Sequence, residues 1–514
     1  MKENYLQFTI KVCLTTFLLI FFSLFFAQKI HLPTDDLGRH ITNGRIFLEQ
    51  GTIIDENFYS YTEPDYPTVT HHWASGVIFY LLWKLFGFKG LSVFYILIHI
   101  ITFYLFFTVS RRKSNFYIAF FCATLAIPLL ADRIDIRPEG FSYLFLGIYF
   151  FILHNIKEHR YSHKVLYIFP ILQIIWVNCH VYFPMGLFLI GVFSLSAWLR
   201  KENAIHYLLA FCFSVLACLI NPFGFSGFIT PFTIFREYGY MVAENQSLLF
   251  MQARFGKLIY IHFEILCAVS LILIILLIIQ KKVRSFFSEI LIIIIFSMLG
   301  WKMSRGIALF GYFFIPIAAS FSYACLDNQL QSVKRFINII LIINSIALIG
   351  GGFLLGGHYF SPIRGRGGIG LLPGVERSAL FFDKNNISGP IFNNYDIGSY
   401  LIFYLFPNIR PFVDNRPEAY SVSFFKNIYV PMQENEAVWH RINDRFSFNA
   451  IFFYRHDMTP WAQPFLIRRL EDPKWAPVYV DNYVLILLRR NNKNERIIKK
   501  YELPKNIFVV NKNI

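Results

Sequence analysis

Residues 73–113 read WASGVIFYLLWKLFGFKGLSVFYILIHIITFYLFFTVSRRK, and this stretch decides the fold. Residues 90–110 are apolar and long enough to cross a bilayer, which takes about 20 residues. The positive-inside rule places the basic cluster 111–113 behind them in the cytoplasm. Residues 73–88 are also apolar, but they contain Lys84 and two tryptophans and are short for a crossing. We therefore expect 73–88 to form an amphipathic helix in the outer interface.

Ten further segments are apolar enough to cross a membrane, and basic residues fall in alternate gaps between them. Counting 73–88 as a crossing would move every later basic cluster to the outside. The sequence therefore predicts eleven transmembrane helices, with 30–89, 221–257 and 357–514 facing outward. The ten segments are 8–29, 115–131, 140–156, 165–179, 183–199, 205–220, 258–280, 286–300, 306–325 and 336–356.

The composition agrees with a multi-pass membrane protein whose main partner is the lipid bilayer. Of 514 residues, 55% are hydrophobic and 16% are charged, whereas soluble domains average roughly 25% charged residues. The formal net charge is +16, but no basic helix or aromatic stacking motif accompanies it, so we expect no nucleic-acid partner. No two of the seven cysteines have metal-ligand spacing.

From about residue 357 the apolar stretches become short and alternate with polar residues. The predicted organisation is a transmembrane domain over 1–356 and a small extracytoplasmic α/β domain over 357–514. The patterns predict strands near 389–392, 411–413, 450–454 and 477–480, and helices near 376–384, 421–432 and 460–470.

The most informative polar segment is Thr34-Asp35-Asp36-Leu37-Gly38-Arg39-His40, directly after the first span. It predicts a helix from about 37 to 50, with Asp35 or Asp36 as its N-cap. One carboxylate is enough for a cap. The second is either a solvated neighbour or a general base at the membrane surface, and the residues alone leave both interpretations open.

Two adjacent histidines, His71 and His72, precede Trp73 in the same outer loop. With His40 or Asp55 they are candidate ligands of a divalent metal, although adjacency in sequence supplies too few ligands for a complete site. Trp73 starts the interfacial helix and is also a candidate membrane anchor.

Short motifs occur across most of the chain. They are Asp36…His40…Gly44-Arg45, the aromatic–Ser–aromatic–Thr stretch 59–62, His71-His72-Trp73, Arg137-Pro138, Asn178-Cys179-His180, Arg305 before Ala308-Leu309-Phe310, Gly398-Ser399-Tyr400, Pro407, Asp414-Asn415-Arg416 and Tyr420. Together they resemble a family of bacterial membrane proteins in the GT-C glycosyltransferase superfamily. Two residues depart from the pattern: Asn57 stands where an acidic residue is usual, and His72 where Glu is common.

The resemblance implies a multi-pass enzyme of the bacterial cytoplasmic membrane with two juxtamembrane helices in its first outer loop. It implies inverting transfer of a sugar from a polyprenyl-phosphate donor to an outer-face acceptor, which could be a glycolipid, a glycan or a protein. Asp36 matches the position of the catalytic base, with Asp35 as the fallback. His40, His71, His72 and Trp73 then belong to the substrate loop. No cofactor is certain, and a divalent metal remains possible.

A lipid phosphate leaving group requires positive charge at the donor site. The candidates are Arg305, Arg137 and Lys302, at predicted outer ends of spans. Arg133 and Asp135 lie in the run 132–137, whose charges alternate in sign, and we expect them to pair within that run. Asp414, Arg416 and Tyr420 are expected to be structural residues of the outer domain.

Three alternative functions remain open. The chain could be an en bloc oligosaccharide transferase or ligase, a transporter or lipid flippase, or a non-enzymatic assembly subunit. The absence of internal repeats and the position of the carboxylates outside the membrane weigh against a transporter.

Overall fold

The computed structural model describes residues 2–234, 237–326, 331–354 and 365–508. The chain divides into two compact units. The first, which we call the helical unit, comprises Met1–Lys29, Gly87–Pro231 and Val242–Gly370. The second, which we call the mixed unit, comprises Ile30–Phe86, Phe232–Met241 and Leu371–Ile514.

A helix coincides with each of the eleven predicted spans, in the part of the chain that the structure describes. Seven helical segments are long and apolar enough to cross a membrane, and the other four are shorter apolar helices. The helices of this unit are α1 (Lys2–Phe26), α4 (Phe116–Leu130), α5 (Glu139–Lys157), α6 (Phe169–Cys179), α7 (Pro184–Leu199), α8 (Ile205–Ala217), α9 (Gly224–Thr233, whose last two residues belong to the mixed unit), α10 (Leu248–Phe255), α11 (Leu258–Ile279), α12 (Phe287–Lys302), α13 (Gly306–Cys325) and α14 (Gln331–Leu354), with short 3-10 turns η2 (His163–Ile168), η3 (Ala243–Asn245) and η4 (Val283–Phe286).

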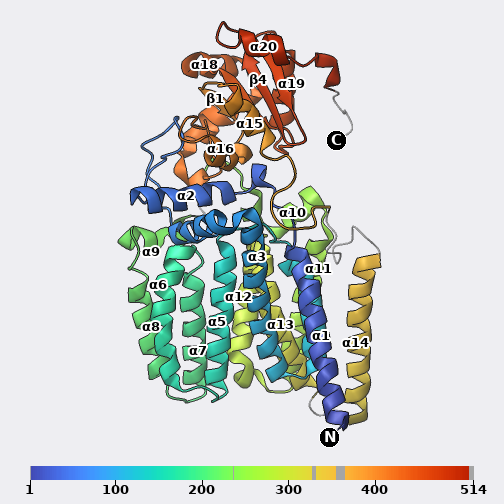
Figure 1. Ribbon diagram of the computed structural model, residues 1–514. Helices are drawn as coiled ribbons and strands as arrows, with labels where there is room; N and C mark the ends of the chain where they lie inside the picture. The colour runs from blue at the N-terminus through green and yellow to red at the C-terminus, as the bar shows by residue number, and fades with distance from the viewer. Residues whose placement is uncertain (1, 235–236, 327–330, 355–364, 509–514) are drawn as a thin grey trace. The chain divides into compact units, whose positions relative to one another are not determined.

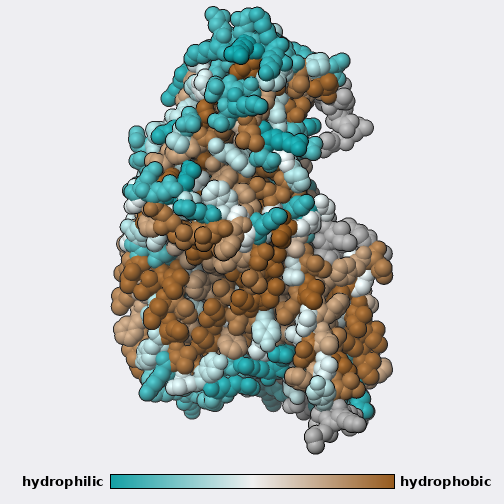
Figure 2. Space-filling view, in the orientation of Figure 1, coloured by the Kyte–Doolittle hydropathy of each residue, from teal (hydrophilic) through white to brown (hydrophobic). Residues whose placement is uncertain are grey.

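Helix α13 forms the centre of the helical unit. It packs against α4, α11 and α12, and α12 in turn packs against α7 (Figure 1). Of its most apolar window 83% is buried, against 17% for α14. A helix that is apolar on all sides belongs in a protein core or in lipid. Hydrophobic residues cover the visible face of the helical unit (Figure 2), as a lipid-embedded bundle requires.

The long helix α3 (Trp73–Lys113) is two helices in succession. Gly87 interrupts its helical conformation with φ 62° and ψ −165°, a left-handed region that favours glycine. The break falls at the penultimate residue of the predicted helix 73–88, shortly before the predicted span 90–110, and the boundary between the two units falls at the same residue. The first part, up to Phe86, therefore belongs to the mixed unit.

The mixed unit contains a four-stranded sheet in the order β1-β2-β4-β3. Strand β1 (Ile391–Asn393) runs parallel to β2 (Ala450–Tyr454), with Ile391 opposite Ala450. Strand β4 (Val484–Arg489) pairs antiparallel with both β2 and β3 (Trp475–Val480). Three of these strands were predicted, and the small α/β domain is confirmed.

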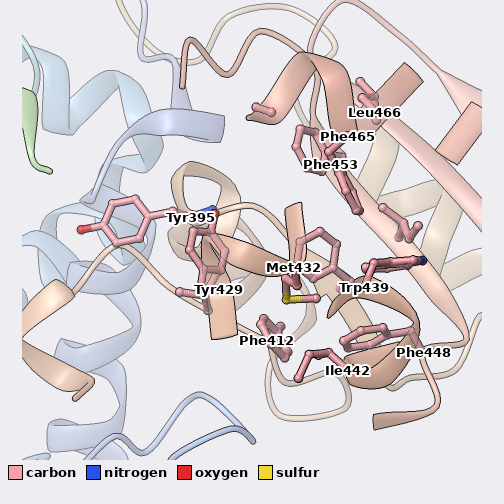
Figure 3. Packing of buried hydrophobic residues seen from close by; sticks show 14 of the residues in the cluster. Tyr395, Phe412, Tyr429, Met432, Trp439, Ile442, Phe448, Phe453, Phe465 and Leu466 are labelled. Carbon is pink, nitrogen blue, oxygen red and sulfur yellow. The ribbon is translucent and has the colours of Figure 1, made fainter. Parts of the chain in front are cut away.

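Aromatic side chains form the core of the mixed unit, and Trp439, Phe448 and Phe465 are buried within it (Figure 3). Such rings bury large apolar areas and so stabilise a small domain. The remaining elements of this unit are η1 (Leu32–Thr34), α2 (Leu37–Gln50), α15 (Arg377–Lys384), η5 (Tyr395–Ile397), α16 (Gly398–Leu405), η6 (Pro417–Ala419), the π-helix η7 (Phe424–Tyr429), α17 (Pro431–Glu434), α18 (Glu436–Phe446), α19 (Ala462–Glu471), α20 (Glu495–Tyr501) and η8 (Lys505–Ile507).

Two predictions in this unit are wrong in detail. Residues 411–413 are not a strand, because side chains bind their backbone: Asn393 bonds to Phe412 N and Val413 O, and Ser60 donates to Phe412 O at 2.9 Å. The predicted helix 421–432 is the π-helix η7 followed by the short α17.

Candidate active site

Asp35 and Asp36 have different partners. Helix α2 begins at Leu37 as predicted, with Asp36 at the N-cap position. The side chain of Asp35 accepts the Leu37 N–H at 3.3 Å, whereas Oδ1 of Asp36 accepts a hydrogen bond of 2.5 Å from the Asn415 side-chain amide. Asp35 thus bonds the start of the helix, and Asp36, half-buried, is directed toward another part of the mixed unit.

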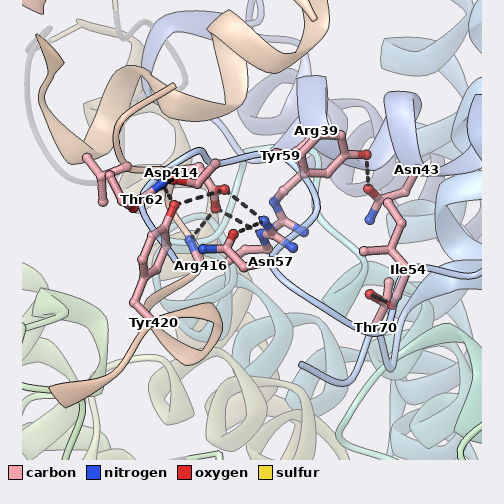
Figure 4. A network of polar contacts seen from close by, with 12 residues as sticks. Arg39, Asn43, Ile54, Asn57, Tyr59, Thr62, Thr70, Asp414, Arg416 and Tyr420 are labelled. Atoms are coloured by element: carbon pink, nitrogen blue, oxygen red, sulfur yellow. Dashed lines mark hydrogen bonds and ion pairs between the residues drawn. The ribbon is translucent and has the colours of Figure 1, made fainter. Parts of the chain in front are cut away.

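Asp414 and Arg416, the residues on either side of Asn415 in the chain, form a buried ion pair with each other (Figure 4). Arg416 donates through Nε and Nη2 to the two carboxylate oxygens of Asp414, each at 2.8 Å. Tyr420 also donates to Asp414 at 3.3 Å. Burial alone would lower the pKa of Arg416, but Asp414 raises it above its usual value. Asp414, Arg416 and Tyr420 therefore have contacts that suit the expected structural role, and they fix the turn that carries Asn415.

Asn57 ties the segment after α2 to the same turn. Its Oδ1 accepts a hydrogen bond of 3.0 Å from Nη2 of Arg416, whose guanidinium also lies 5.1 Å from the Tyr59 ring centroid. Tyr59 in turn donates to Asn43 on α2 at 2.5 Å. The side-chain oxygen of Asn57 thus accepts a hydrogen bond from the Arg416 guanidinium, and the Asp414 carboxylate neutralises its charge.

Helix α2 lies so close to its neighbours that only glycine fits at two of its positions. A Cβ on Gly44 would lie 2.1 Å from the carbonyl oxygen of Gly76, on the first part of α3. A Cβ on Gly38 would lie 2.8 Å from the carbonyl oxygen of Ser399 on α16. The Arg39 N–H also donates to Ser399 Oγ at 2.9 Å. These contacts hold the start of α2, and therefore Asp36, against both helices.

His40 on α2 lies beside the two histidines that precede α3. The ring of His72 lies 4.5 Å from that of His40 and 4.4 Å from that of His71. Nη1 of Arg39 faces Nε2 of His72 at 3.3 Å, which opposes a cation there. Trp73 starts α3 as predicted and packs on Phe47.

His71, His72 and Asp55 are the candidate metal ligands of the sequence. Nδ1 of His71 faces the Val69 carbonyl at 3.1 Å, and Asp55 is exposed. Burial lowers the pKa of His71 to about 4, so this ring is neutral at physiological pH. Among the described residues no three His, Cys, Asp or Glu side chains come together as metal ligands. A metal-binding role of this loop stays a prediction.

A second carboxyl group lies in the electrostatic environment of Asp36. Burial, and then the negative charges of Asp457 and Asp36, raise the pKa of Asp396 to about 7. Asp457 is held by the Asn394 side-chain amide at 2.9 Å. The mixed unit thus contains one carboxyl group that accepts a hydrogen bond from Asn415 and another that is readily protonated near neutral pH.

Three arginines of the helical unit share one carboxylate. Glu244, on η3, lies 3.0 Å from Nη1 of Arg133, 2.9 Å from Nη1 of Arg137 and 3.3 Å from Nη2 of Arg305. Arg133 also bonds Glu139 at 2.6 Å. Burial alone would raise the pKa of Glu244, but Arg133, Arg137 and Arg305 outweigh it and hold that pKa below its usual range.

The structure corrects the prediction that the charges of residues 132–137 pair with one another. It also distinguishes among the candidate phosphate-binding residues. Arg133 does not pair within that run, because its partners are Glu139 and Glu244, and Asp135 lies 3.8 Å from Arg366. Arg137 and Arg305 share the cluster, whereas Lys302, the last residue of α12, is exposed.

Asn415 and Glu244 are functional candidates that the sequence did not single out. Asn415 is 379 positions from Asp36, and Glu244 is 107 positions from Arg137. In the sequence, Asn415 stands out only as a member of the motif Asp414-Asn415-Arg416, and Glu244 only as a charged residue in the predicted outer segment 221–257. Asp36, Asp35 and the histidines belong to the mixed unit, and Arg137, Arg305 and Lys302 to the helical unit.

Solved structures with a similar fold are membrane glycosyltransferases. The oligosaccharyltransferase AglB from Archaeoglobus fulgidus, in complex with an inhibitory peptide and a dolichol-phosphate, matches with a TM-score of 0.58 and 12% identity over 92% of this chain and 74% of its own. The Archaeoglobus fulgidus enzyme in complex with Zn and sulfate matches with a TM-score of 0.54 and 10% identity, over 92% and 73% of the two chains.

The arabinofuranosyltransferase AftD from Mycobacteria matches with a TM-score of 0.54 and 13% identity, over 94% of this chain but 40% of its own. The fold of this chain is similar to that of these GT-C glycosyltransferases. No protein-family model and no curated protein sequence matches it. The fold predicted from the short motifs is therefore confirmed by structure, at identities that establish the fold alone.

Proposed function

We propose that this protein is a membrane glycosyltransferase that moves a sugar from a polyprenyl-phosphate donor to an acceptor on the outer face of a bacterial cytoplasmic membrane. The observation that carries the proposal is the arrangement at Asp36, a carboxylate at the start of α2 that is held by Asn415 and is not used as the helix cap. The GT-C fold supports glycosyl transfer as the chemistry.

In the proposed reaction Asp36 is the general base. The acceptor hydroxyl attacks the anomeric carbon, its proton passes to the carboxylate, and the bond from that carbon to the lipid phosphate breaks with inversion. The hydrogen bond from Asn415 orients the carboxylate. Asp35, bonded to the Leu37 N–H, is the fallback base and the less suited of the two.

The leaving lipid phosphate needs stabilisation of its negative charge. Arg305 and Arg137 are the proposed ligands, and Arg133 joins them because it shares Glu244 with both. Guanidinium groups bind phosphate in a bidentate manner, which fixes the phosphate as well as its charge. Lys302, being exposed, is proposed as a weaker contributor. His40, His71, His72 and Trp73 shape the loop beside Asp36.

En bloc oligosaccharide transfer is the second candidate, favoured by the likeness to the oligosaccharyltransferase AglB. Its acceptor would be a protein or lipid and its donor a lipid-linked oligosaccharide. Transfer assays with a monosaccharide donor and an oligosaccharide donor, each on a polyprenyl carrier, separate the two candidates by the product formed.

The test compares Asp36→Asn with Asp35→Asn in the full chain. Asn keeps hydrogen-bonding capacity but takes up no proton at neutral pH, so Asp36→Asn should lower the transfer rate by about 10²–10⁴-fold. Asp35→Asn should retain most activity, because an amide oxygen can still accept the Leu37 N–H. Yield and melting temperature in detergent should match the parent in both variants. Full activity in Asp36→Asn would overturn the proposal.

A further inference from the structure

Glu244 occupies the place that an anion would take among three guanidinium groups. Its two carboxylate oxygens reach Arg133, Arg137 and Arg305 at 2.9 to 3.3 Å. A phosphate bound by the same arginines would use the same donors, since carboxylate and phosphate oxygens accept the same guanidinium hydrogen bonds. The two anions therefore compete for one set of N–H groups.

The second carboxylate of the cluster is less able to leave. Glu139 is the first residue of α5, is 4% exposed and is bonded to Arg133. The Glu244 side chain is 27% exposed and comes from a 3-10 turn of three residues. Of the two carboxylates, Glu244 can return to water at the lower desolvation cost.

The backbone around Glu244 is anchored independently of its side chain. The Glu244 carbonyl oxygen accepts hydrogen bonds from Ser304 Oγ at 3.3 Å and from the Arg305 N–H at 3.4 Å. The Ser304 N–H also donates to the Gln246 carbonyl at 3.0 Å. Rotation of the side chain would free the guanidinium groups while these bonds keep the turn in place.

From this geometry we propose that Glu244 is a displaceable counter-ion that holds the three-arginine site ready for the phosphate of a lipid-linked donor. The inference rests on the proposed function and deepens it, because it adds Arg133 to the phosphate ligands and gives Glu244 a role. When phosphate enters, the Glu244 carboxylate leaves the arginines for water. When the lipid phosphate departs, Glu244 neutralises the cluster again.

Competition by the carboxylate should weaken phosphate binding, because only the fraction of protein with Glu244 displaced is competent to bind. The test measures the affinity of the full chain in detergent for a polyprenyl monophosphate. Glu244→Gln keeps the shape and removes the charge, and it should bind the lipid phosphate roughly tenfold more tightly than the parent. Asp132→Asn is the matched control, because it changes the net charge equally and should leave the affinity unchanged.

A folded Glu244→Gln variant that binds the lipid phosphate no more tightly than the parent would overturn the inference while leaving the proposed function standing. Absence of binding in the parent as well would overturn the proposed phosphate site itself. Should Glu244→Gln fail to fold, Glu244→Asp replaces it. Its shorter side chain holds the arginines less well, so tighter binding than the parent is expected, and equal or weaker binding contradicts the inference.

Discussion

The side-chain amide of Asn415 donates a 2.5 Å hydrogen bond to Oδ1 of Asp36. A charge-assisted hydrogen bond of this kind fixes the orientation of a carboxylate. Asn415 is itself fixed, because Asp414 and Arg416 on either side of it form a buried ion pair. Asn415 therefore acts as a positioning residue for the proposed base.

Replacement of Asn415 should affect the turnover step. In Asn415→Leu the donor is lost, and kcat should fall about 10- to 100-fold with little change in the KM for donor. In Asn415→Asp the amide donor is replaced by a second carboxylate beside Asp36, so kcat should fall at least as far. Initial rates measured against donor concentration check both variants. Asn427→Leu, at an exposed site of the same unit, is the control.

The Asp414–Arg416 pair should be important for stability. Asp414→Asn leaves the Arg416 charge buried without its carboxylate, which should cost about 3–5 kcal/mol of unfolding free energy. The midpoint of thermal unfolding in detergent measures the loss. Arg490→Gln is the comparison, because it removes the exposed Arg490–Glu502 pair and should cost at most about 1 kcal/mol. Equal effects in the two variants would contradict the structural role.

Even one methyl group at Gly44 should separate α2 from the first part of α3. The added Cβ would meet the Gly76 carbonyl oxygen at 2.1 Å, and backbone cannot move aside as a side chain can. We expect Gly44→Ala to destabilise the mixed unit by about 1–3 kcal/mol or more and to increase its protease sensitivity. Gly350→Ala on α14 meets no atom within 4 Å and should be neutral or slightly stabilising.

The raised pKa of Asp396, about 7, predicts a pH-dependent stability. Above its usual value of 3.8 the unfolded chain has lost this proton while the native protein still holds it, so stability falls as the pH rises through about 7. Asp396→Asn removes this dependence. The variant should melt a few degrees above the parent at about pH 8 and near the parent at about pH 4. A variant that melts lower at about pH 8 would contradict this burial effect.

Apolar segment length predicted the helices well, because hydropathy and chain length are local properties. A helix lies at each of the eleven predicted spans in the described chain. Gly87 interrupts α3 close to where the predicted interfacial helix 73–88 gives way to the span 90–110. The α/β domain was predicted less well. Phe412 reads as a strand residue, but its backbone groups are bonded by the side chains of Asn393, Ser60 and Thr62.

In the candidate site, too, the features set by local sequence could be predicted and the tertiary contacts could not. Asp36 could be found because it follows the first span and starts a helix, and both signals are local. Its contact with Asn415 could not be found, and neither could the contacts of Glu244 with the arginines, because these residues are brought to their partners only by tertiary folding. The alternating charges of 132–137 predicted local pairs, but the fold supplied Arg133 with Glu139 at the start of α5 and with Glu244.

The order of the chain also bears on how the protein is made. The mixed unit combines Ile30–Phe86 with Leu371–Ile514, so Asp36 is synthesised long before Asn415. At about 5–20 residues per second, the ribosome needs roughly 15–60 s to pass from one segment to the other. During that interval the helical unit can assemble while helix α2 lacks both α16 and the 414–416 turn. The mixed unit is therefore completed late in biogenesis, and a chain shortened before Leu371 should leave its first segment accessible to chaperones and proteases.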